Sequence, residues 1–378
     1  MKKTVYLFVT ITLFTFFACG NKSKNTAHSA NDSALAISAD TLLTYSELEG
    51  YPIDYDLIVT ETVVVTDKQG VDAKQEPDEN SKTLLHYNYG DRLEVIETAD
   101  DFYSIRERIT RKWQDEHSTY EGSRWEKVFV KKSALGDFSD IKLIPADLNV
   151  IDFMGENGNQ NSDNFENGKI LDKYLKVELI DRQTFENQMN NKVDYFVADT
   201  ANVKKMDGVI TLHCAEKDVK LKDNPSGGDN EIYYDYAGQY EFLNQYVIYM
   251  SGWEWLGYKF YDKTTGKDQF EDNFSFGEFP YVSPDRQHII CIYANPYEVT
   301  SDVELYKIDR GKIKNMMTAS YTNWMPFSEQ ISETEWKETM FWASDGCFYL
   351  KANHSKSHWT EAGHYNENYQ YLRIKLLP

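Results

Sequence analysis

The chain has 378 residues, which is long enough for two domains with separate hydrophobic cores. Its formal net charge is −21, so its surface repels nucleic-acid phosphates and anionic lipid headgroups; we expect no nucleic-acid partner and no basic membrane-binding face. Aromatic residues make up 15% of the chain, a content that excludes a disordered protein and is typical of β-sheets.

The first residues have the order of an export signal. Two lysines precede an uncharged, mostly apolar run, residues 5–18, which is shorter than a membrane-spanning helix requires. The run ends at Cys19, between an alanine and a glycine, and this junction resembles the lipobox of bacterial lipoproteins. The resemblance implies a signal peptide over residues 1–18 and a membrane anchor through lipid on Cys19. The alternative is an ordinary secretory signal in which the cysteine is incidental.

This export signal predicts a location in the cell envelope, facing the periplasm or the exterior. Residues 19–45 are rich in Asn, Ser, Ala and Lys and lack apolar periodicity, so we expect a flexible tether. The remainder of the chain is predicted to be mostly β, with a domain over residues 46–140 and a C-terminal β-rich domain over residues 141–378.

Short strands separated by turns are predicted between residues 58 and 136, from β-branched and aromatic enrichment and period-two alternation. Their order resembles a bacterial SH3-type domain of exported cell-wall proteins. The matching positions are Val71 to Lys74 with Pro77 and Ser81 in the opening, Leu84 and Leu85, Gly90 in the turn, Leu93 and Val95, the aromatic pair Phe102 and Tyr103, and the closing Phe129, Val130 and Leu135.

Two departures from that family pattern stand out. Val128 occupies the usual glycine position, and a polar excursion over residues 106–124 replaces a tight hairpin. The resemblance implies a small SH3-like β-barrel that recognises a peptide or a cell-wall fragment. Tyr103 and Trp125 are the aromatic candidates for its peptide groove.

The C-terminal part contains strand and turn units at uneven spacing. Residues 281–292 carry a Ser-Pro-Asp turn, and residues 341–350 carry Asp345-Gly346, which favours a hairpin. These units resemble the blades of periplasmic β-propellers, although Arg286 replaces the expected glycine. The resemblance implies a larger antiparallel, partly propeller-like β-domain, as an open sheet arrangement or a closed ring. A short helix is expected over residues 184–191.

Three histidines have a spacing that suggests zinc chemistry. His354, His358 and His364 stand at the offsets of metzincin zinc ligands, but Ser355 and Glu361 occupy the positions of the general base and the turn glycine. The flanking segments read as strands, so we expect a polar hairpin loop, with no metal site and no cofactor.

No other spacing indicates catalysis. Cys214, Cys291 and Cys347 lack the surroundings of a cysteine-peptidase nucleophile, and we expect buried, inert thiols, with Cys214 on the core face of a strand. The glycine-rich phosphate loop, the Gly-x-Ser-x-Gly motif and His-Glu-x-x-His are all missing from the sequence. The sequence therefore predicts a protein without catalytic residues.

Two tryptophans form the remaining candidate binding feature. If residues 252–258 are a strand, Trp253 and Trp255 share one face and could stack on a sugar ring or clamp a peptide. We expect them instead to pack in the core of a sheet.

These observations predict a cell-envelope lipoprotein that acts as a binding or scaffold module for a peptide, peptidoglycan or protein ligand. One alternative is an envelope hydrolase with an unrecognised acid/base site among the 61 acidic residues. Another is an acidic inhibitor or immunity protein that neutralises a basic toxin.

Overall fold

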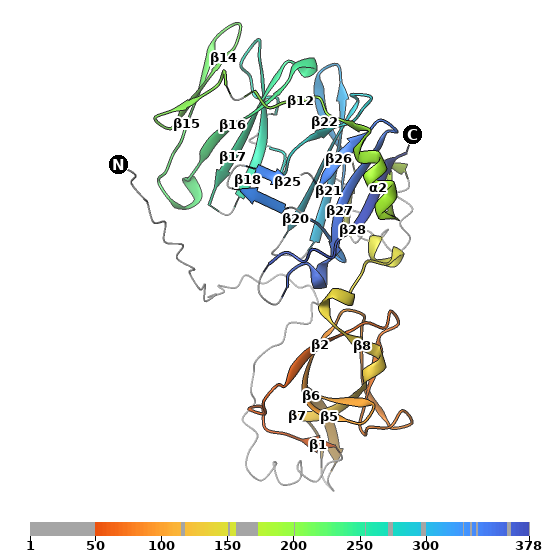
Figure 1. The fold of residues 1–378 in the computed structure, drawn as a ribbon. Helices are drawn as coiled ribbons and strands as arrows, with labels where there is room; N and C mark the ends of the chain where they lie inside the picture. The colour runs from red at the N-terminus through yellow and green to blue at the C-terminus, as the bar shows by residue number, and fades with distance from the viewer. Residues whose placement is uncertain are drawn as a thin grey trace, which may run out of the picture. The chain divides into compact units, whose positions relative to one another are not determined.

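The fold comes from a computed structural model, shown in Figure 1. The structure describes residues 50–377, with gaps at 115–117, 150–151, 156–172, 200, 254, 271–274, 296–299, 328, 333–334, 338 and 361–363. Cys19, the predicted signal peptide and the predicted tether lie outside these residues. The chain divides into two units, residues 1–49 with 113–119, and residues 50–112 with 120–378, and the second unit is described below.

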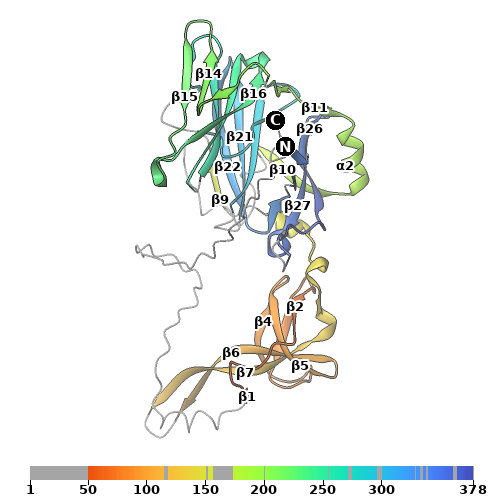
Figure 2. The same ribbon diagram turned by 60° about the vertical axis from the view of Figure 1, so that its left-hand side comes forward.

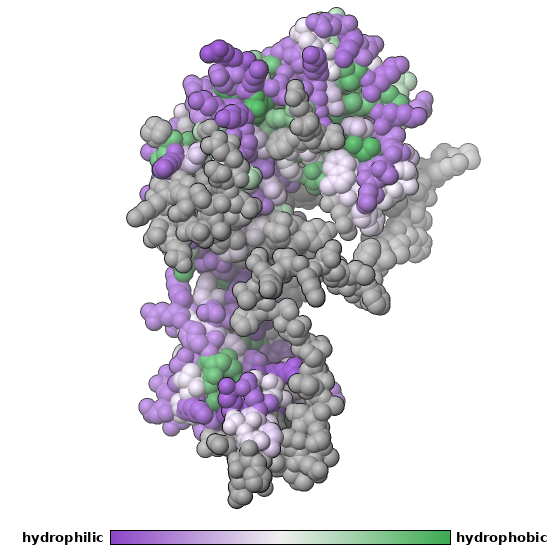
Figure 3. Space-filling model, turned by 180° about the vertical axis from the view of Figure 1, so that it is seen from behind, coloured by the Kyte–Doolittle hydropathy of each residue, from purple (hydrophilic) through white to green (hydrophobic). Residues whose placement is uncertain are grey.

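The prediction of a mostly β fold is confirmed. The described residues form six antiparallel sheets, and none of these sheets is closed into a barrel. Within the described residues, no helix is both long enough and apolar enough to cross a membrane. On the face that Figure 3 shows, hydrophilic residues predominate among the described residues, and hydrophobic residues gather in small patches. This distribution agrees with the strong negative charge of the sequence.

The first sheet holds all described strands up to residue 136, and none of them pairs with a later strand. Its strand order is β4-β3-β7-β6-β5-β2-β8, with β1 paired to β7. The strands are β1 (Tyr51–Pro52), β2 (Glu61–Val65), β3 (Val71–Lys74), β4 (Thr83–Tyr87), β5 (Arg92–Ala99), β6 (Phe102–Gln114), β7 (Thr119–Lys131) and β8 (Leu135–Gly136). The expected closed barrel is therefore wrong, because β4 and β8 remain the edges of an open sheet.

The polar excursion of residues 106–124 is also structured in a way that the sequence did not indicate. Apart from Ser118, its described residues belong to β6 and β7, two neighbouring strands of 13 residues each. Along these strands, exposed charged residues alternate with a few buried residues. The polar sequence therefore comes from an exposed strand face and not from a loop.

A buried ion cluster lies within these two strands. Glu126 is fully buried, and its two carboxylate oxygens accept hydrogen bonds from Arg111 (2.7 and 3.0 Å) and from Arg124 (2.8 Å). Burial alone would raise the pKa of Glu126, but the hydrogen bonds from the two guanidinium groups hold it below its ordinary value. The cluster links β6 to β7 and favours a single pairing register of these two strands.

We expect Glu126→Ala to destabilise the protein by about 3–5 kcal/mol, because it leaves two buried guanidinium charges without their carboxylate. The matched control is Glu121→Ala, which removes the exposed Lys112–Glu121 pair (3.0 Å) and should change stability by less than about 0.5 kcal/mol. Urea unfolding followed by circular dichroism measures both. Equal midpoints for the two variants would contradict the role of the cluster.

The remaining sheets follow residue 150. Their strands are β9 (Asp152–Gly155), β10 (Leu175–Ile180), β11 (Lys192–Val193), β12 (Phe196–Val197), β13 (Lys205–Met206), β14 (Val209–His213), β15 (Asp218–Lys222), β16 (Tyr233–Tyr240), β17 (Gln245–Gly252), β18 (Trp255–Asp262), β19 (Tyr281–Val282), β20 (His288–Asn295), β21 (Thr300–Asp309), β22 (Lys312–Tyr321), β23 (Trp324–Pro326), β24 (Glu329–Ser332), β25 (Glu335–Lys337), β26 (Met340–Ala343), β27 (Cys347–His354) and β28 (Gln370–Leu376).

These strands build four main sheets and the separate β24–β25 pair. The orders are β13-β14-β15, then β12-β16-β17-β18, then β19-β20-β21-β22-β9, and last β10-β28-β27-β26-β11 with β23 paired to β27. The first three follow one another along the chain, apart from the added edge strands β12 and β9. The last sheet joins the end of the chain to β10 and β11, so segments about 150 to 200 residues apart share one sheet.

The four sheets pack face to face in succession, as Figure 2 shows. Ile210 and Leu212 of β14 contact Ile248 of β17, and Phe260 of β18 shares a core with Cys291 of β20. The other face of β20 to β22 packs on β27 and β28. The core between them contains Ile290, Val303, Met317, Phe348, Leu350 and Leu372. This succession of sheets is propeller-like in part, and the described cores join neighbouring sheets only.

One helix covers the outer face of the last sheet. Helix α2 (Arg182–Met189) buries Phe185 against Phe341 and Tyr371. The helix lies close to the predicted position, but its N-cap is Asp181, whose carboxylate accepts a hydrogen bond from the backbone N–H of Thr184 (2.7 Å).

The predicted strand and turn units are confirmed in the β19–β20 and β26–β27 hairpins. Arg286 adopts φ of 59°, the left-handed conformation that glycine usually supplies at this turn position. Its guanidinium lies over the ring of Tyr195, 4.4 Å from the ring centre, which gives the arginine a packing role that glycine lacks. In the second hairpin, Gly346 has φ of 79° and Asp345 accepts a hydrogen bond from the backbone of Cys347.

Candidate functional site

The strongest concentration of unusual chemistry lies on one face of the β20–β22 sheet. Glu304 of β21 stands opposite Cys291 of β20 and Thr318 of β22, and Asp302 stands opposite Tyr293 and Ser320. Because successive side chains on a strand alternate between faces, these two rows project from the same face. This face points toward β18. We call Glu278, Asp302 and Glu304, with the tyrosines beside them, the carboxylate–tyrosine cluster.

Glu278 reaches this region from the segment between β18 and β19. The bridge between Tyr258 and Phe276 fixes the segment, with backbone hydrogen bonds of 2.8 and 2.9 Å in the two directions. Gly277 lies against Tyr293, because a Cβ atom there would lie 3.3 Å from the Tyr293 ring. The segment that carries Glu278 therefore touches the strand that faces Glu304 and Asp302.

Both glutamates are half-buried, and each has a strongly shifted proton affinity. Burial raises the pKa of Glu278 to about 7, against a weaker opposing effect of its hydrogen bond from the Phe279 backbone. Burial also raises the pKa of Glu304 to about 7, with a hydrogen bond from the Tyr306 hydroxyl (2.9 Å) opposing it and the charge of Asp302 adding to it. Near neutral pH, each side chain can therefore give or accept a proton.

Tyr258, Tyr293 and the thiol of Cys291 complete the cluster. Asp302 is buried and accepts a hydrogen bond from the Ser320 hydroxyl. Burial, followed by the charges of Glu304 and Asp302, raises the pKa of Tyr293, and burial followed by Glu278 raises that of Tyr258. These groups are neutral donors and aromatic surfaces, so they bring no positive charge to the carboxylates.

The sequence offered no signal that could single these carboxylates out. Glu304 lies between two buried apolar residues of a strand, and this alternation by itself predicts that its side chain is exposed to solvent. Glu278 is in an irregular segment, and its surroundings depend on the packing of two sheets.

The tryptophans that the sequence singled out are not in a core, so that expectation is wrong. Trp253 lies in the turn between β17 and β18 and is 50% exposed, whereas Trp255 begins β18 and is 38% exposed. They do not share a strand face, because Trp253 is outside both strands. The indole of Trp255 lies over Gly252, where any side chain would collide with it.

The two aromatic candidates of the first sheet lie in different surroundings. Tyr103 packs against the core of that sheet, and Lys132 lies 5.2 Å from its ring centre. Trp125 packs instead on Tyr55, with ring centres 4.9 Å apart, and Arg106 lies 4.5 Å from the centre of the Tyr55 ring. The structure therefore does not bring Tyr103 and Trp125 into one site.

A segment that sequence reasoning missed runs beside Trp125. We call residues 51–58 the strap. It pairs with β7 and is held by hydrogen bonds from the Ile53 backbone to Trp125 (2.9 Å) and from Arg106 to the Tyr55 carbonyl (2.6 Å). Several of its large hydrophobic residues are exposed, which is unusual for a segment so well fixed, and they are Tyr51, Tyr55, Leu57 and Ile58.

The histidines do not form the exposed polar loop that the sequence predicted. His354 ends β27, and His358 follows a short 3-10 helix (Ser355–Ser357); both are at most 3% exposed, while His364 is exposed. His354 accepts a hydrogen bond from the Lys356 backbone (3.1 Å), and His358 packs edge-on against Tyr365. No three His, Cys, Asp or Glu side chains of the described residues are placed to hold a metal ion.

We expect these two histidines to make the protein sensitive to acid. Burial lowers the pKa of each to about 4, below the ordinary value of 6.5. Between pH 6.5 and pH 4 the unfolded chain therefore binds protons that the folded protein does not, and stability should fall as the pH is lowered through this window. His358→Ala should flatten that fall and, at pH 7, cost about 2 kcal/mol for the lost packing.

His213→Ala is the matched control, because His213 is exposed and pairs only with Asp218 (2.9 Å). It should change stability by less than about 0.5 kcal/mol at either pH. Thermal unfolding at pH 7 and pH 4.5 compares the three proteins. Identical behaviour of the two variants would contradict a buried role for His358.

The three described cysteines are free thiols, and Cys291 and Cys347 are buried. Cys214 is half-buried and packs against the core that contains Ile210 and Leu212, as its place in the alternation predicted. Burial raises the pKa of all three, which makes them unreactive at neutral pH.

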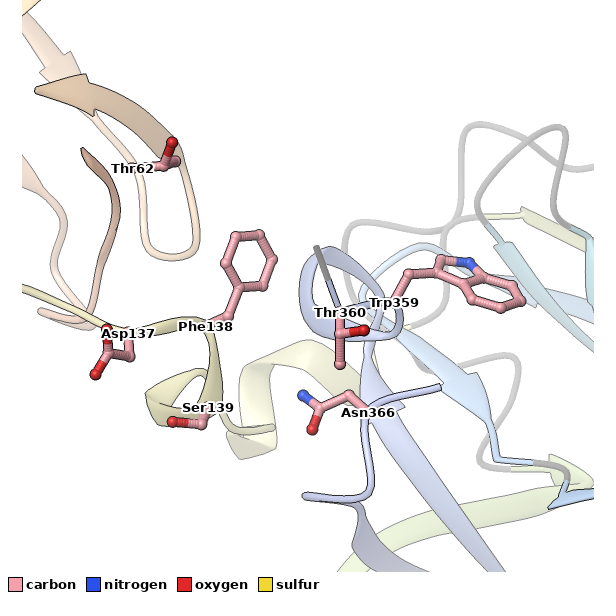
Figure 4. A pocket seen from close by; sticks show the side chains of 7 residues that line it. All are labelled: Thr62, Asp137, Phe138, Ser139, Trp359, Thr360 and Asn366. Carbon is pink, nitrogen blue, oxygen red and sulfur yellow. The ribbon is translucent and has the colours of Figure 1, made fainter. Parts of the chain in front are cut away.

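A crevice of about 330 Å³ lies beside a 3-10 helix (Phe138–Asp140). Its lining residues are Thr62, Asp137, Phe138, Ser139, Trp359, Thr360 and Asn366. In Figure 4 the Phe138 ring points into the space between Thr62 and Thr360, while the Trp359 indole points away from Phe138. Trp359 also stacks on Tyr365, with 4.4 Å between the ring centres.

Comparisons with known proteins give no family for this chain. No known family of proteins matches it, and no curated protein is similar to it. Among solved structures, the crystal structure of TolB from Acinetobacter baumannii is a weak match with 9% sequence identity and a TM-score of 0.19. The match covers 84% of this chain and 64% of the TolB chain, which is less than two thirds of it. A TM-score this low shows no shared fold, so nothing is transferred from TolB.

Proposed function

We propose that the protein is a lipid-anchored lipoprotein of the cell envelope that binds other molecules through its β-sheets and does not transform them. The two lysines, the apolar run of residues 5–18 and the small residues beside Cys19 support the anchor. A surface with a net charge of −21 supports attachment by acyl chains, because a basic membrane-binding face would need the opposite charge.

We expect Cys19 to carry diacylglycerol, and mass spectrometry of the membrane fraction should detect it. Cys19→Ser should move the protein from the membrane fraction to the soluble fraction, because no acyl chain remains to hold it. A Cys19→Ser protein that stays fully with the membrane would contradict the anchor.

The first sheet is proposed to be an SH3-type module that binds a peptide of the cell wall. The observation that carries this proposal is the exposed hydrophobic surface of the strap next to Trp125. Ile58 is 82% exposed and Tyr55 is 54% exposed, although hydrogen bonds fix the strap to β6 and β7. A rigid surface of aromatic and aliphatic groups suits an extended peptide, because little side-chain entropy is lost on binding.

Sedimentation with purified, insoluble peptidoglycan tests this proposal. We expect the wild-type protein to sediment with it, and Tyr55→Ala with Trp125→Ala to weaken binding by at least about tenfold, as loss of aromatic contacts usually does. Trp253→Ala is the control, because Trp253 is 50% exposed, close to the 54% of Tyr55, but lies in the β17–β18 turn. Thermal unfolding checks that the double variant is folded.

Failure of the wild-type protein to sediment would contradict the proposed ligand. Equal loss of binding in the Trp253 variant would contradict the proposed surface.

A hydrolase is the second candidate, and one observation favours it. Glu278 and Glu304 have pKa values of about 7, which suit a general acid and a general base at neutral pH. The same incubation distinguishes the two functions. Soluble fragments that appear with the wild-type protein and disappear with Glu304→Gln would favour the hydrolase, whereas binding without release supports the module.

A further inference from the structure

The crevice beside the 3-10 helix (Phe138–Asp140) has no part in the proposed recognition of a peptide by the strap. Its volume is about 330 Å³. Small-molecule sites in proteins usually have volumes of about 300–1,000 Å³, so this one is at the lower end of the range. The space suits one or two rings of a small ligand.

Hydrogen bonds hold the two walls of the crevice together. One wall belongs to residues 137–143, and the other belongs to the described part of residues 357–370. The Gln370 amide accepts a hydrogen bond from the Leu143 N–H and donates one to the Leu143 carbonyl (3.1 Å), and two further hydrogen bonds join the same walls. Leu143 is also buried in a hydrophobic core. The crevice is therefore preformed, and a ligand does not have to order its walls.

Asn366 presents a fixed polar group to the crevice. The residue is only 8% exposed, its amide nitrogen donates a hydrogen bond to the Ser357 carbonyl (2.8 Å), and its amide oxygen accepts one from the Asn368 N–H (3.0 Å). An amide group has two donor hydrogens and two acceptor lone pairs, so one of each remains after these two bonds within the described part of the chain. In Figure 4 this amide points toward the segment of Phe138 and Ser139.

Aromatic rings lie in the crevice and at its rim. The Phe138 ring points into the space, as Figure 4 shows, and Arg92 lies 5.1 Å from its ring centre. At the rim, Trp359 is 46% exposed and stacks on Tyr365, and both rings rest edge-on against the buried ring of His358. Because the Trp359 indole points away from Phe138, the two aromatic surfaces suit successive rings of one chain.

The lining side chains narrow the class of ligand. Of those that the structure describes, three carry hydroxyl groups, one is an amide, one is a carboxylate and none is basic, and they are Thr62, Ser139, Thr360, Asn366 and Asp137. Without a basic lining residue the crevice does not favour a phosphate or another anion. Neutral donors and acceptors beside aromatic faces suit a ring that is apolar on its faces and hydroxylated around its edge.

We propose that the crevice binds a neutral oligosaccharide, with one sugar ring against Phe138 and hydrogen-bonded to Asn366, and the next sugar unit over Trp359. The site is separate from the strap, and it does not depend on the proposed recognition of a peptide there. With both sites, the protein would hold the sugar chain and the peptide of a wall polymer at different places.

Isothermal titration calorimetry of the purified full-length protein tests the proposal with chitotetraose and cellotetraose. These neutral, β-1,4-linked tetrasaccharides differ in their acetamido groups, and we expect at least one of them to bind. Phe138→Ala and Trp359→Ala should each weaken binding by at least about tenfold. Trp253→Ala is the matched control, because Trp253 is 50% exposed but is not a lining residue, and it should bind as the wild type does.

A second measurement uses a variant that keeps an aromatic ring at the rim. The bound sugar changes the surroundings of the Trp359 indole, so the tryptophan fluorescence of the wild-type protein should change on addition of the tetrasaccharide. Trp359→Phe should retain binding in calorimetry and lose most of that fluorescence change. Thermal unfolding of every variant shows whether it remains folded.

Three outcomes would overturn the proposal. The first is that neither tetrasaccharide binds to the wild-type protein. The second is unchanged affinity of folded Phe138→Ala and Trp359→Ala proteins. The third is loss of binding in the protein with Tyr55→Ala and Trp125→Ala, which would place the sugar on the strap. Unchanged sugar binding by that double variant supports a separate site, whether or not the strap binds a peptide.

Discussion

The β20–β22 sheet is covered by other sheets on both of its faces, and the arrangement of the C-terminal part depends on this. One face contributes Ile290 and Val303 to the core shared with β27 and β28. The opposite face contributes Ile289, Cys291 and Tyr306 to the core shared with β18. A sheet buried on both faces is normally apolar on both, because strands there cannot use water to satisfy polar side chains. The face toward β18 departs from this rule, because it also carries Asp302 and Glu304.

That departure explains the unusual carboxylates. The side chains that project toward β18 change along β21 from apolar to polar, so that Glu304 and Asp302 lie where the apolar core ends. There they lose part of their hydration without gaining a positive partner from the described part of the chain, and burial raises the pKa of Glu304 and of Glu278. The first sheet shows the opposite solution, since the buried Glu126 is neutralised by Arg111 and Arg124.

Local patterns in the sequence predict the strands and turns well, because alternation and turn residues act over a few positions. Asp345-Gly346 and the Ser-Pro-Asp turn both lie where hairpins form. Burial of polar residues is different, because it depends on which distant segment covers a strand. His354 and His358 read as an exposed loop, yet they are buried beneath Tyr89 and Tyr365. The same limit applies to Glu278 and Glu304, whose surroundings arise only when two sheets pack together.

Glu278 and Glu304 are half-buried carboxylates without a cationic partner among the described residues. Carbon-13 NMR of the glutamate side-chain carboxyl groups, assigned with the Glu278→Gln and Glu304→Gln variants, measures their pKa values directly. Both groups should titrate at a pKa of about 7, because burial disfavours their charged forms. Titration of both near 4.3, the value of an exposed glutamate, would contradict it.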